Sequence, residues 1–227
     1  MNIFLNILFL FFLGGFVGYF IELIYRRIVH HHFINPGFLH GPFLPIYGFG
    51  LLLLYGLSSV PLNFIQIKWV DIILRIVLIF ISLTLIEYIG GLIFIKGLNI
   101  RLWDYSNRKG NIQGIICPLF FFVWGGIGTF YFFFIHPLIV SLLKVVDSNI
   151  FLSFFMGLFL GILLLDFINS FQVAKKVGNM LRKLNLHISY DTLKSKLKTY
   201  ASKHHLKHNF FRPFHHNFEK IKDINSN

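Results

Sequence analysis

The feature that most constrains this chain is a series of long apolar runs separated by short polar breaks. A membrane-spanning helix needs about 20 apolar residues, because the hydrocarbon core is about 30 Å thick and a helix rises about 1.5 Å per residue. Four runs meet this length, and a fifth is shorter and less regular. The predicted spans are 3–25, 43–60, 70–95, 117–140 and 150–172. The sequence therefore predicts an all-α, polytopic membrane protein with five transmembrane helices.

Composition and charge distribution agree with this class. Hydrophobic residues make up 56% of the chain and charged residues 13%, against averages for soluble domains of about 45–50% and 25%. Residues 173–227 hold 12 of the 21 Lys and Arg but 3 of the 9 acids. We expect residues 1–172 to form the membrane domain and 173–227 a basic cytoplasmic tail beside anionic lipid headgroups. Nucleic acid is not an expected partner, because no soluble domain carries the positive charge.

The short loops predict the orientation, because cytoplasmic loops of membrane proteins are enriched in Lys and Arg. The breaks after the first and third predicted helices hold six basic residues, and those after the second and fourth hold two. The six are Arg26, Arg27, Lys96, Arg101, Arg108 and Lys109, and the two are Lys68 and Lys144. The N-terminus is therefore expected outside and the C-terminus in the cytoplasm.

Residues 35–50 are rich in Gly and Pro, which together supply seven of these sixteen positions. Each Pro removes a backbone donor and disfavours helix in the residue before it. Non-helical backbone at membrane depth is tolerated only when it is buried in protein or lines a wet cavity. Two interpretations stay open: a re-entrant segment that lines a binding site, or a cytoplasmic loop that starts the second helix at Pro42 or Pro45. His40 and Tyr47 are site candidates in either case.

Three acids lie inside the apolar runs, at similar depth in the cytoplasmic half of the membrane: Glu22, Glu87 and Asp166. A carboxylate at the centre of a membrane helix costs roughly 2.5–3.5 kcal/mol on insertion scales, so such residues usually have a function. One hypothesis is a shared polar cavity for a cation, proton or basic substrate group, with Arg26 nearby. The alternative is that Glu22 pairs with Arg26 while the other acids bond neighbouring helices.

Further candidates come from the loop 101–114 and from the tail. Trp103, Asp104, Tyr105 and Asn111 combine interfacial rings with polar groups that could cap a helix or close the cavity. In the tail, an apolar stripe among lysines predicts a basic amphipathic helix at the lipid surface; its members are Leu193, Leu197, Tyr200 and Ala201. The tail histidines lack an acid or Cys at tetrahedral spacing, so we expect no metal site and no cofactor.

Several short motifs carry a family resemblance. They are Glu22-Leu-Ile-Tyr25, Gly37-Phe-Leu-His-Gly-Pro-Phe-Leu-Pro-Ile-Tyr-Gly48, Glu87-Tyr88, Trp103-Asp-Tyr-Ser106 and His136-Pro137. In this order they resemble the bacterial CmpB-like, ABC-transporter type IV membrane proteins, over about residues 10–172. The resemblance implies a permease subunit. The sequence contains no Gly-x-x-x-x-Gly-Lys-Ser/Thr loop, so the expected ATP-hydrolysing motor is a separate ATPase subunit.

The function predicted from these features is that of a transporter permease-like subunit in the bacterial plasma membrane, with a polar cavity on the cytoplasmic side. It would work with an ATPase partner or as a homo-oligomer. A membrane-embedded enzyme acting on a lipid headgroup is the alternative, with Glu87, Asp104, Asp166 and His40 supplying acid–base or metal-binding groups. A third possibility is a structural or assembly protein whose acids only join helices.

Overall fold

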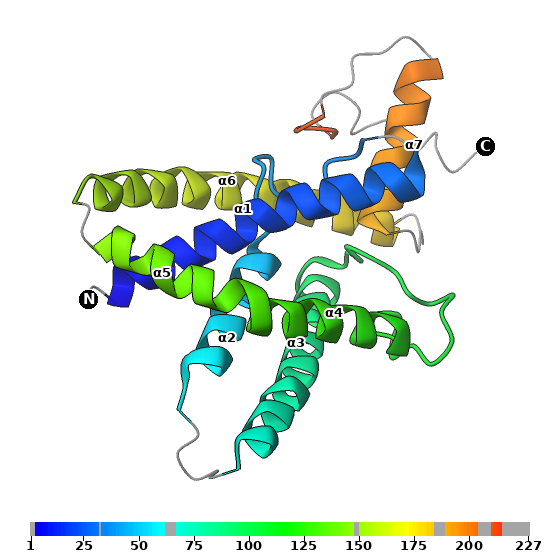
Figure 1. Ribbon diagram of the computed structural model, residues 1–227. Helices are drawn as coiled ribbons and strands as arrows, with labels where there is room; N and C mark the ends of the chain where they lie inside the picture. The colour runs from blue at the N-terminus through cyan, green and yellow to red at the C-terminus, as the bar shows by residue number, and fades with distance from the viewer. Residues whose placement is uncertain are drawn as a thin grey trace. The chain divides into compact units, whose positions relative to one another are not determined.

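A computed structural model describes residues 3–31, 33–61, 67–147, 150–183, 189–203 and 210–214 (Figure 1). These residues form α-helices, one π-helical segment and connecting loops, with isolated bridges but no strands. In order, the helical elements are α1 (Ile3–His30), α2 (Pro45–Ser59), α3 (Lys68–Leu98), α4 (Pro118–Phe130), η1 (Tyr131–Ile135), α5 (His136–Asp147), α6 (Ile150–Lys183) and α7 (Tyr190–Lys203). The prediction of an all-α protein is confirmed.

Within this described part, four helical stretches are long and apolar enough to cross a membrane. They are Ile3–Ile28, Lys68–Leu98, Pro118–Val146 and Phe151–Lys183. Many of their large apolar side chains are exposed, among them Phe154 and Leu165 of α6, as expected where lipid replaces water. All four extend past the C-terminal ends of the predicted spans, because the helix continues through the polar residues that follow each apolar run.

The fifth predicted span, 43–60, is a shorter helix. With 15 residues, α2 is about 22 Å long, less than the roughly 30 Å of a hydrocarbon core. It begins at Pro45, since proline fits the first turn of a helix, where its missing N–H has no partner to lose. The preceding residues, among them Pro42 and Leu44, are non-helical. Length and composition therefore support four candidate spans and leave α2 as a shorter apolar helix.

The third candidate span is continuous through α4, η1 and α5 (Figure 1). Pro137 explains the π-helical turn in its middle, which covers Tyr131–Ile135. A proline inside a helix donates no hydrogen bond and its ring meets the carbonyl group four residues earlier. A π-turn inserts an extra residue and so accommodates that ring.

The chain divides into two compact units, and α1, α3 and α6 each contribute to both. Unit 1 comprises Met1–Val17, Pro45–Gly90 and Tyr105–Leu160, and unit 2 comprises Gly18–Leu44, Gly91–Asp104 and Gly161–Asn227. In unit 1, α1 and α2 approach closely where glycines face the partner helix. A Cβ atom on Gly14 would lie 2.7 Å from the carbonyl oxygen of Tyr47, and one on Gly48 equally close to that of Phe11. Small residues at these points allow the two backbones to touch.

In unit 2, α6 packs against the C-terminal end of α3. A Cβ atom on Gly178 would collide with the backbone oxygen of Leu98. On the same side of the unit, the Tyr190 amide at the start of α7 donates to the Arg101 carbonyl, 2.6 Å away. The C-terminal parts of α3 and α6 therefore meet the start of α7 in one packed unit.

Candidate functional site

The loop between α1 and α2, residues 33–44, is the centre of the polar structure of unit 2, and we refer to it as the Gly–Pro loop. It has no regular secondary structure, yet most of its residues are buried or half-buried. The Asn35 side chain donates to the Leu39 carbonyl oxygen at 3.2 Å and closes a turn. The prolines that prevent a helix leave backbone N–H and C=O groups that need partners. Two side chains from other elements, Asp166 and Lys194, each bond to two of these groups, and Ser170 and Lys198 each bond to one.

Asp166 on α6 is the first of these side chains. Its Oδ2 accepts a hydrogen bond from the Gly41 amide at 2.7 Å, and its Oδ1 accepts one from the His40 amide at 3.1 Å. Ser170, one helical turn further along α6, donates its hydroxyl to the same Oδ1 at 2.9 Å. One carboxylate on an apolar helix thus holds the backbone of the Gly–Pro loop.

The same carboxylate orients the His40 ring. Nδ1 of His40 lies 2.9 Å from Asp166 Oδ1 and 2.6 Å from Ser170 Oγ. Because the carboxylate oxygen only accepts, this geometry favours the tautomer with a proton on Nδ1, which leaves the lone pair on Nε2. A histidine held in this way can bind a donor group or take up a proton at Nε2.

Lys194 on α7 is the second side chain that serves the Gly–Pro loop. Its Nζ donates to the carbonyl oxygens of Asn35 at 2.7 Å and Gly37 at 2.6 Å, and it lies 4.7 Å from the centre of the Tyr190 ring. The side chain is only 3% exposed. Burial lowers the pKa of Lys194 to about 8, although the nearby carboxylate of Asp191 opposes the shift.

A chain of alternating charges joins α1 to α7. Glu22 Oε1 accepts from Arg26 Nε at 3.1 Å, and Arg26 Nη1 lies 2.6 Å from Asp191 Oδ1. The same oxygen of Asp191 is 3.6 Å from Lys194 Nζ. Arg26 is buried, so its charge depends on these carboxylates for compensation. The predicted pairing of Glu22 with Arg26 is present, and Asp191 extends it to the tail helix.

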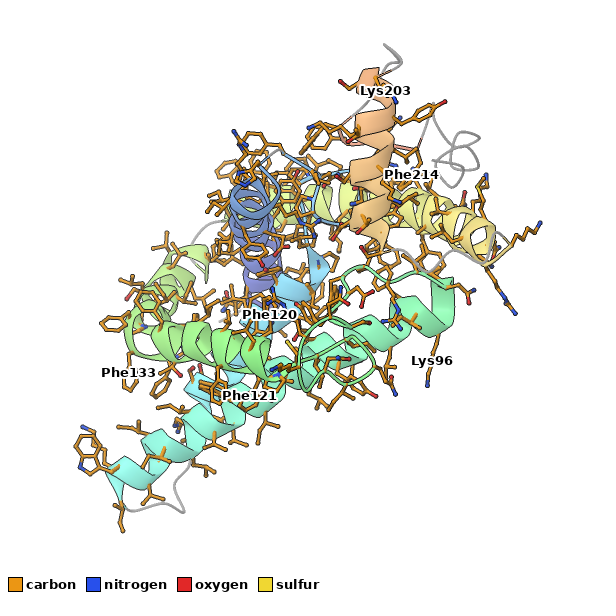
Figure 2. The ribbon with its side chains drawn as sticks, turned by 90° about the vertical axis from the view of Figure 1, so that its right-hand side faces the viewer. Lys96, Phe120, Phe121, Phe133, Lys203 and Phe214 are labelled. Carbon is orange, nitrogen blue, oxygen red and sulfur yellow. The ribbon has the colours of Figure 1, made fainter. Side chains whose placement is uncertain are left out.

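A cavity of about 400 Å³ lies beside the Gly–Pro loop and within unit 2. Its walls come from this loop, α6, α7 and residues 211–214, and Phe214 lies next to α7 with its ring 5.1 Å from that of Tyr190 (Figure 2). The lining residues are Asn35, Gly37, Phe38, Leu39, His40, Val173, Lys176, Tyr190, Lys194, Phe211, Arg212, Pro213 and Phe214. These described lining residues include four basic or imidazole side chains, several aromatic ones and no carboxylate.

Unit 1 contains Glu87, the third of the acids that lie inside the apolar runs. Glu87 on α3 is buried, and its Oε1 accepts a hydrogen bond from the Tyr105 hydroxyl at 3.0 Å. The Tyr105 ring stacks on Phe120 of α4 with centroids 4.5 Å apart. Tyr47 on α2 makes an edge contact with Trp124 at 5.8 Å. This group joins α3, α4 and the loop 99–117, which is the interhelical role considered as the alternative for a membrane acid.

The other predicted site residues have local contacts. Asp104 lies 3.5 Å from Arg101 at a half-exposed position. Asn111 donates to the carbonyl oxygens of Ser106 and Arg108 and accepts from the Gly114 amide, so it shapes its own loop. Trp103 is half-buried in unit 2. Glu22 and Asp166 belong to unit 2 and Glu87 to unit 1, each with a different partner, and a cavity shared by all three stays a prediction.

Sequence reasoning did not single out four residues of this candidate site: Lys176, Asp191, Lys194 and Arg212. Asp191 had a signal, since it is an acid at the start of an amphipathic helix in an otherwise basic tail. The stripe of that helix faces protein, because Leu193, Leu197 and Ala201 are fully buried. Within the described residues, no group of three His, Cys, Asp or Glu could hold a metal ion. All of the tail histidines lie outside those residues.

The helices, the apolar exposed surface and the buried polar loop define a polytopic membrane protein of the α-helical class. A family model described as "Putative ABC-transporter type IV" matches residues 9–171, and the chain belongs to this family. The match covers the Gly–Pro loop and Asp166 and ends before α7. No curated protein and no solved structure matches the chain.

Proposed function

We propose that this chain is the membrane subunit of a transporter, and that the cavity beside the Gly–Pro loop is its solute-handling site. The observation that carries the proposal is the anchoring of that loop by Asp166, a carboxylate on an apolar membrane helix. Interrupted, non-helical backbone is typical of transporter binding sites. His40, which this carboxylate orients, is on the cavity wall. Membership of an ABC-transporter family supports a subunit that works with a separate ATPase.

A topology of five crossings, with the C-terminus in the cytoplasm, is part of the proposal. The contact between Arg26 and Asp191 requires the end of α1 and the start of α7 to lie on the same side of the membrane. Between these points the chain passes through the candidate spans of α3, α4–α5 and α6, which is an odd number of crossings. A crossing by α2 makes the number even. A 22 Å helix can cross the membrane if the bilayer thins locally or if flanking loop residues complete the crossing. Either adjustment costs a modest free energy.

We expect cysteine labelling to reveal whether the chain crosses the membrane an even number of times between Arg26 and Asp191. In a Cys117→Ser background, Phe33→Cys and Ser106→Cys should react with a membrane-impermeant maleimide from the cytoplasmic side, and Val60→Cys from the outer side. Phe33 and Val60 are about half exposed, so reagent can reach both. If α2 does not cross, Phe33→Cys and Val60→Cys will react from one side, opposite to Ser106→Cys.

A second experiment addresses transport itself. Host cells that lack this chain should differ from wild-type cells in the distribution of at least one solute between cytoplasm and medium, measured by untargeted mass spectrometry. The wild-type chain should restore the distribution, and His40→Gln should not. Asp71→Asn is the matched control, since it removes a membrane-helix acid paired with Arg75 in unit 1. Equal restoration by all three chains would contradict a role for the cavity in transport.

The oriented His40 favours one other function, an enzyme acting on a lipid headgroup in the bacterial plasma membrane. A histidine whose Nδ1 faces a carboxylate is a common general base. In that case the same experiment would give a different result: the lipid species would change in mass, while solutes would keep their distribution. The two functions therefore predict separable profiles for the His40→Gln cells.

A further inference from the structure

The charge of the cavity wall differs from that expected for a cation site. Four lining side chains are basic or imidazole groups, His40, Lys176, Lys194 and Arg212, and none of the described lining residues is an acid. Two nearby acids already contact lining residues: Asp166 lies 2.9 Å from His40 Nδ1, and Asp191 lies 3.6 Å from Lys194 Nζ. Lys176 on α6 and Arg212 are exposed, so their charge reaches a ligand that enters from the open side.

The rest of the wall is apolar. Phe38 of the Gly–Pro loop, Val173 of α6 and the rings of Tyr190, Phe211 and Phe214 line the same cavity. A small inorganic anion would leave this aromatic surface without a partner. A volume of about 400 Å³ lies in the range of sites that bind small organic ligands. The wall therefore fits a molecule with an anionic head and an apolar portion.

The position of the cavity along α6 agrees with such a ligand. Lys175 and Lys176 follow the apolar part of this helix, just after the span 150–172 that the sequence predicts. Basic residues at that level attract anionic headgroups at the membrane surface. Arg offers a planar fork of donors that matches phosphate oxygens, and Lys a compact charge for the same group.

We propose that the cavity binds an amphiphile with a phosphate head, its phosphate between Lys176 and Arg212 and its apolar part against the aromatic wall. The source of this chemistry is either a membrane lipid or a soluble phosphate ester. The inference rests on the proposed function in using the same cavity, and it adds the class of ligand. It replaces the expectation from sequence of a cation or a basic substrate group for this cavity.

Calorimetric titration of the full-length protein in a non-ionic detergent tests the proposal. The probes are dioctanoyl phosphatidic acid, dioctanoyl phosphatidylcholine, hexyl phosphate and inorganic phosphate. Phosphatidic acid or hexyl phosphate should bind at least tenfold more tightly than inorganic phosphate, and phosphatidylcholine should bind weakly. Preference for phosphatidic acid over hexyl phosphate assigns the source to lipid, and the reverse order to a soluble ester. Equal affinity for inorganic phosphate and both amphiphiles would overturn the proposal.

Two neighbouring lysines provide a matched pair of variants. Lys176→Gln should weaken binding of the preferred amphiphile about tenfold, the effect of losing one favourable charge contact of about 1.4 kcal/mol. Lys175→Gln removes another exposed charge from the same turn of α6, but Lys175 does not line the cavity. The affinity of this variant for the amphiphile should stay within about twofold of wild type. Equal weakening by both variants would indicate general attraction to the charged surface and overturn the site.

The two sets of experiments fail independently. If the amphiphile does not bind but cysteine labelling gives the expected sides, only this inference is contradicted. If the amphiphile binds but Phe33→Cys and Val60→Cys react from the same side, only the proposed topology is contradicted.

Discussion

Substitution of Asp166 by asparagine should speed amide hydrogen exchange at His40 and Gly41 by about 100-fold. The carboxylate accepts from both amides, one at each oxygen, and asparagine offers one carbonyl oxygen and one NH₂ group. That NH₂ group would face a backbone donor. Hydrogen bonds to charged groups contribute roughly 1.5–3 kcal/mol each, and a loss of about 3 kcal/mol in the opening free energy corresponds to 100-fold faster exchange.

Ser170→Ala is the control for this prediction. Ser170 donates to the same carboxylate oxygen and also accepts from the His40 amide at 3.2 Å. Both backbone bonds to Asp166 survive its removal, and the Gly41 amide, which bonds to Asp166 and not to Ser170, is the position to compare. Mass spectrometry should find less than a tenfold change in exchange for this variant. Equal exchange in the wild type and Asp166→Asn would mean that packing and the bonds to Ser170, Lys194 and Lys198 hold the Gly–Pro loop, and that Asp166 is not its anchor.

Much of the fold follows from hydrophobicity, and for a physical reason. A bilayer sets a minimum length for an apolar helix, so the four long runs were predictable as helices. Their ends were not, because polar residues continue a helix beyond the lipid: α6 runs on to Lys183, past the predicted boundary at 172. For α2, the pattern of prolines allowed a start at either Pro42 or Pro45, and the helix begins at the second.

The candidate site was predictable only where its partners share one helix. Glu22 with Arg26, and Asp166 with Ser170, are four residues apart and lie on one helix face. His40 and Asp166 are 126 residues apart in sequence, and their contact depends on the conformation of the Gly–Pro loop. Helical spacing carries no information about such a contact.

The tail illustrates why an amphipathic pattern does not identify its partner. Leu193, Leu197 and Ala201 form an apolar stripe among lysines, which is typical of helices at a lipid surface. The same stripe suits packing on protein, and here it is buried in unit 2. The exposed lysines Lys196 and Lys203, the second at the far end of α7 (Figure 2), keep charge available for anionic lipid. Contact with headgroups through these lysines stays a proposal.

Breaking the ion pair between Arg26 and Asp191 should release α7 from the rest of unit 2. Asp191→Asn leaves a buried guanidinium with Glu22 as its remaining carboxylate, and it also removes the acid nearest Lys194. Removing one partner of a buried pair typically costs about 3–5 kcal/mol. A thiol at the fully buried position Ala201, introduced as Ala201→Cys in a Cys117→Ser background, should then react with maleimide at least 100-fold faster.

Two comparisons distinguish this ion pair from general loss of charge. Asp104→Asn breaks a half-exposed pair with Arg101 in the same unit, and such pairs contribute about 0–1 kcal/mol, so the thiol rate should change by less than about fivefold. The double variant Arg26→Met with Asp191→Leu removes both charges, and it should react more slowly than Asp191→Asn because no buried guanidinium is left uncompensated. If all these variants react at the wild-type rate, the buried stripe and the other hydrogen bonds of α7, such as those of Lys194 and of the Tyr190 amide, hold this helix without the ion pair. The contact between Arg26 and Asp191 would then no longer support the proposal that α2 crosses the membrane.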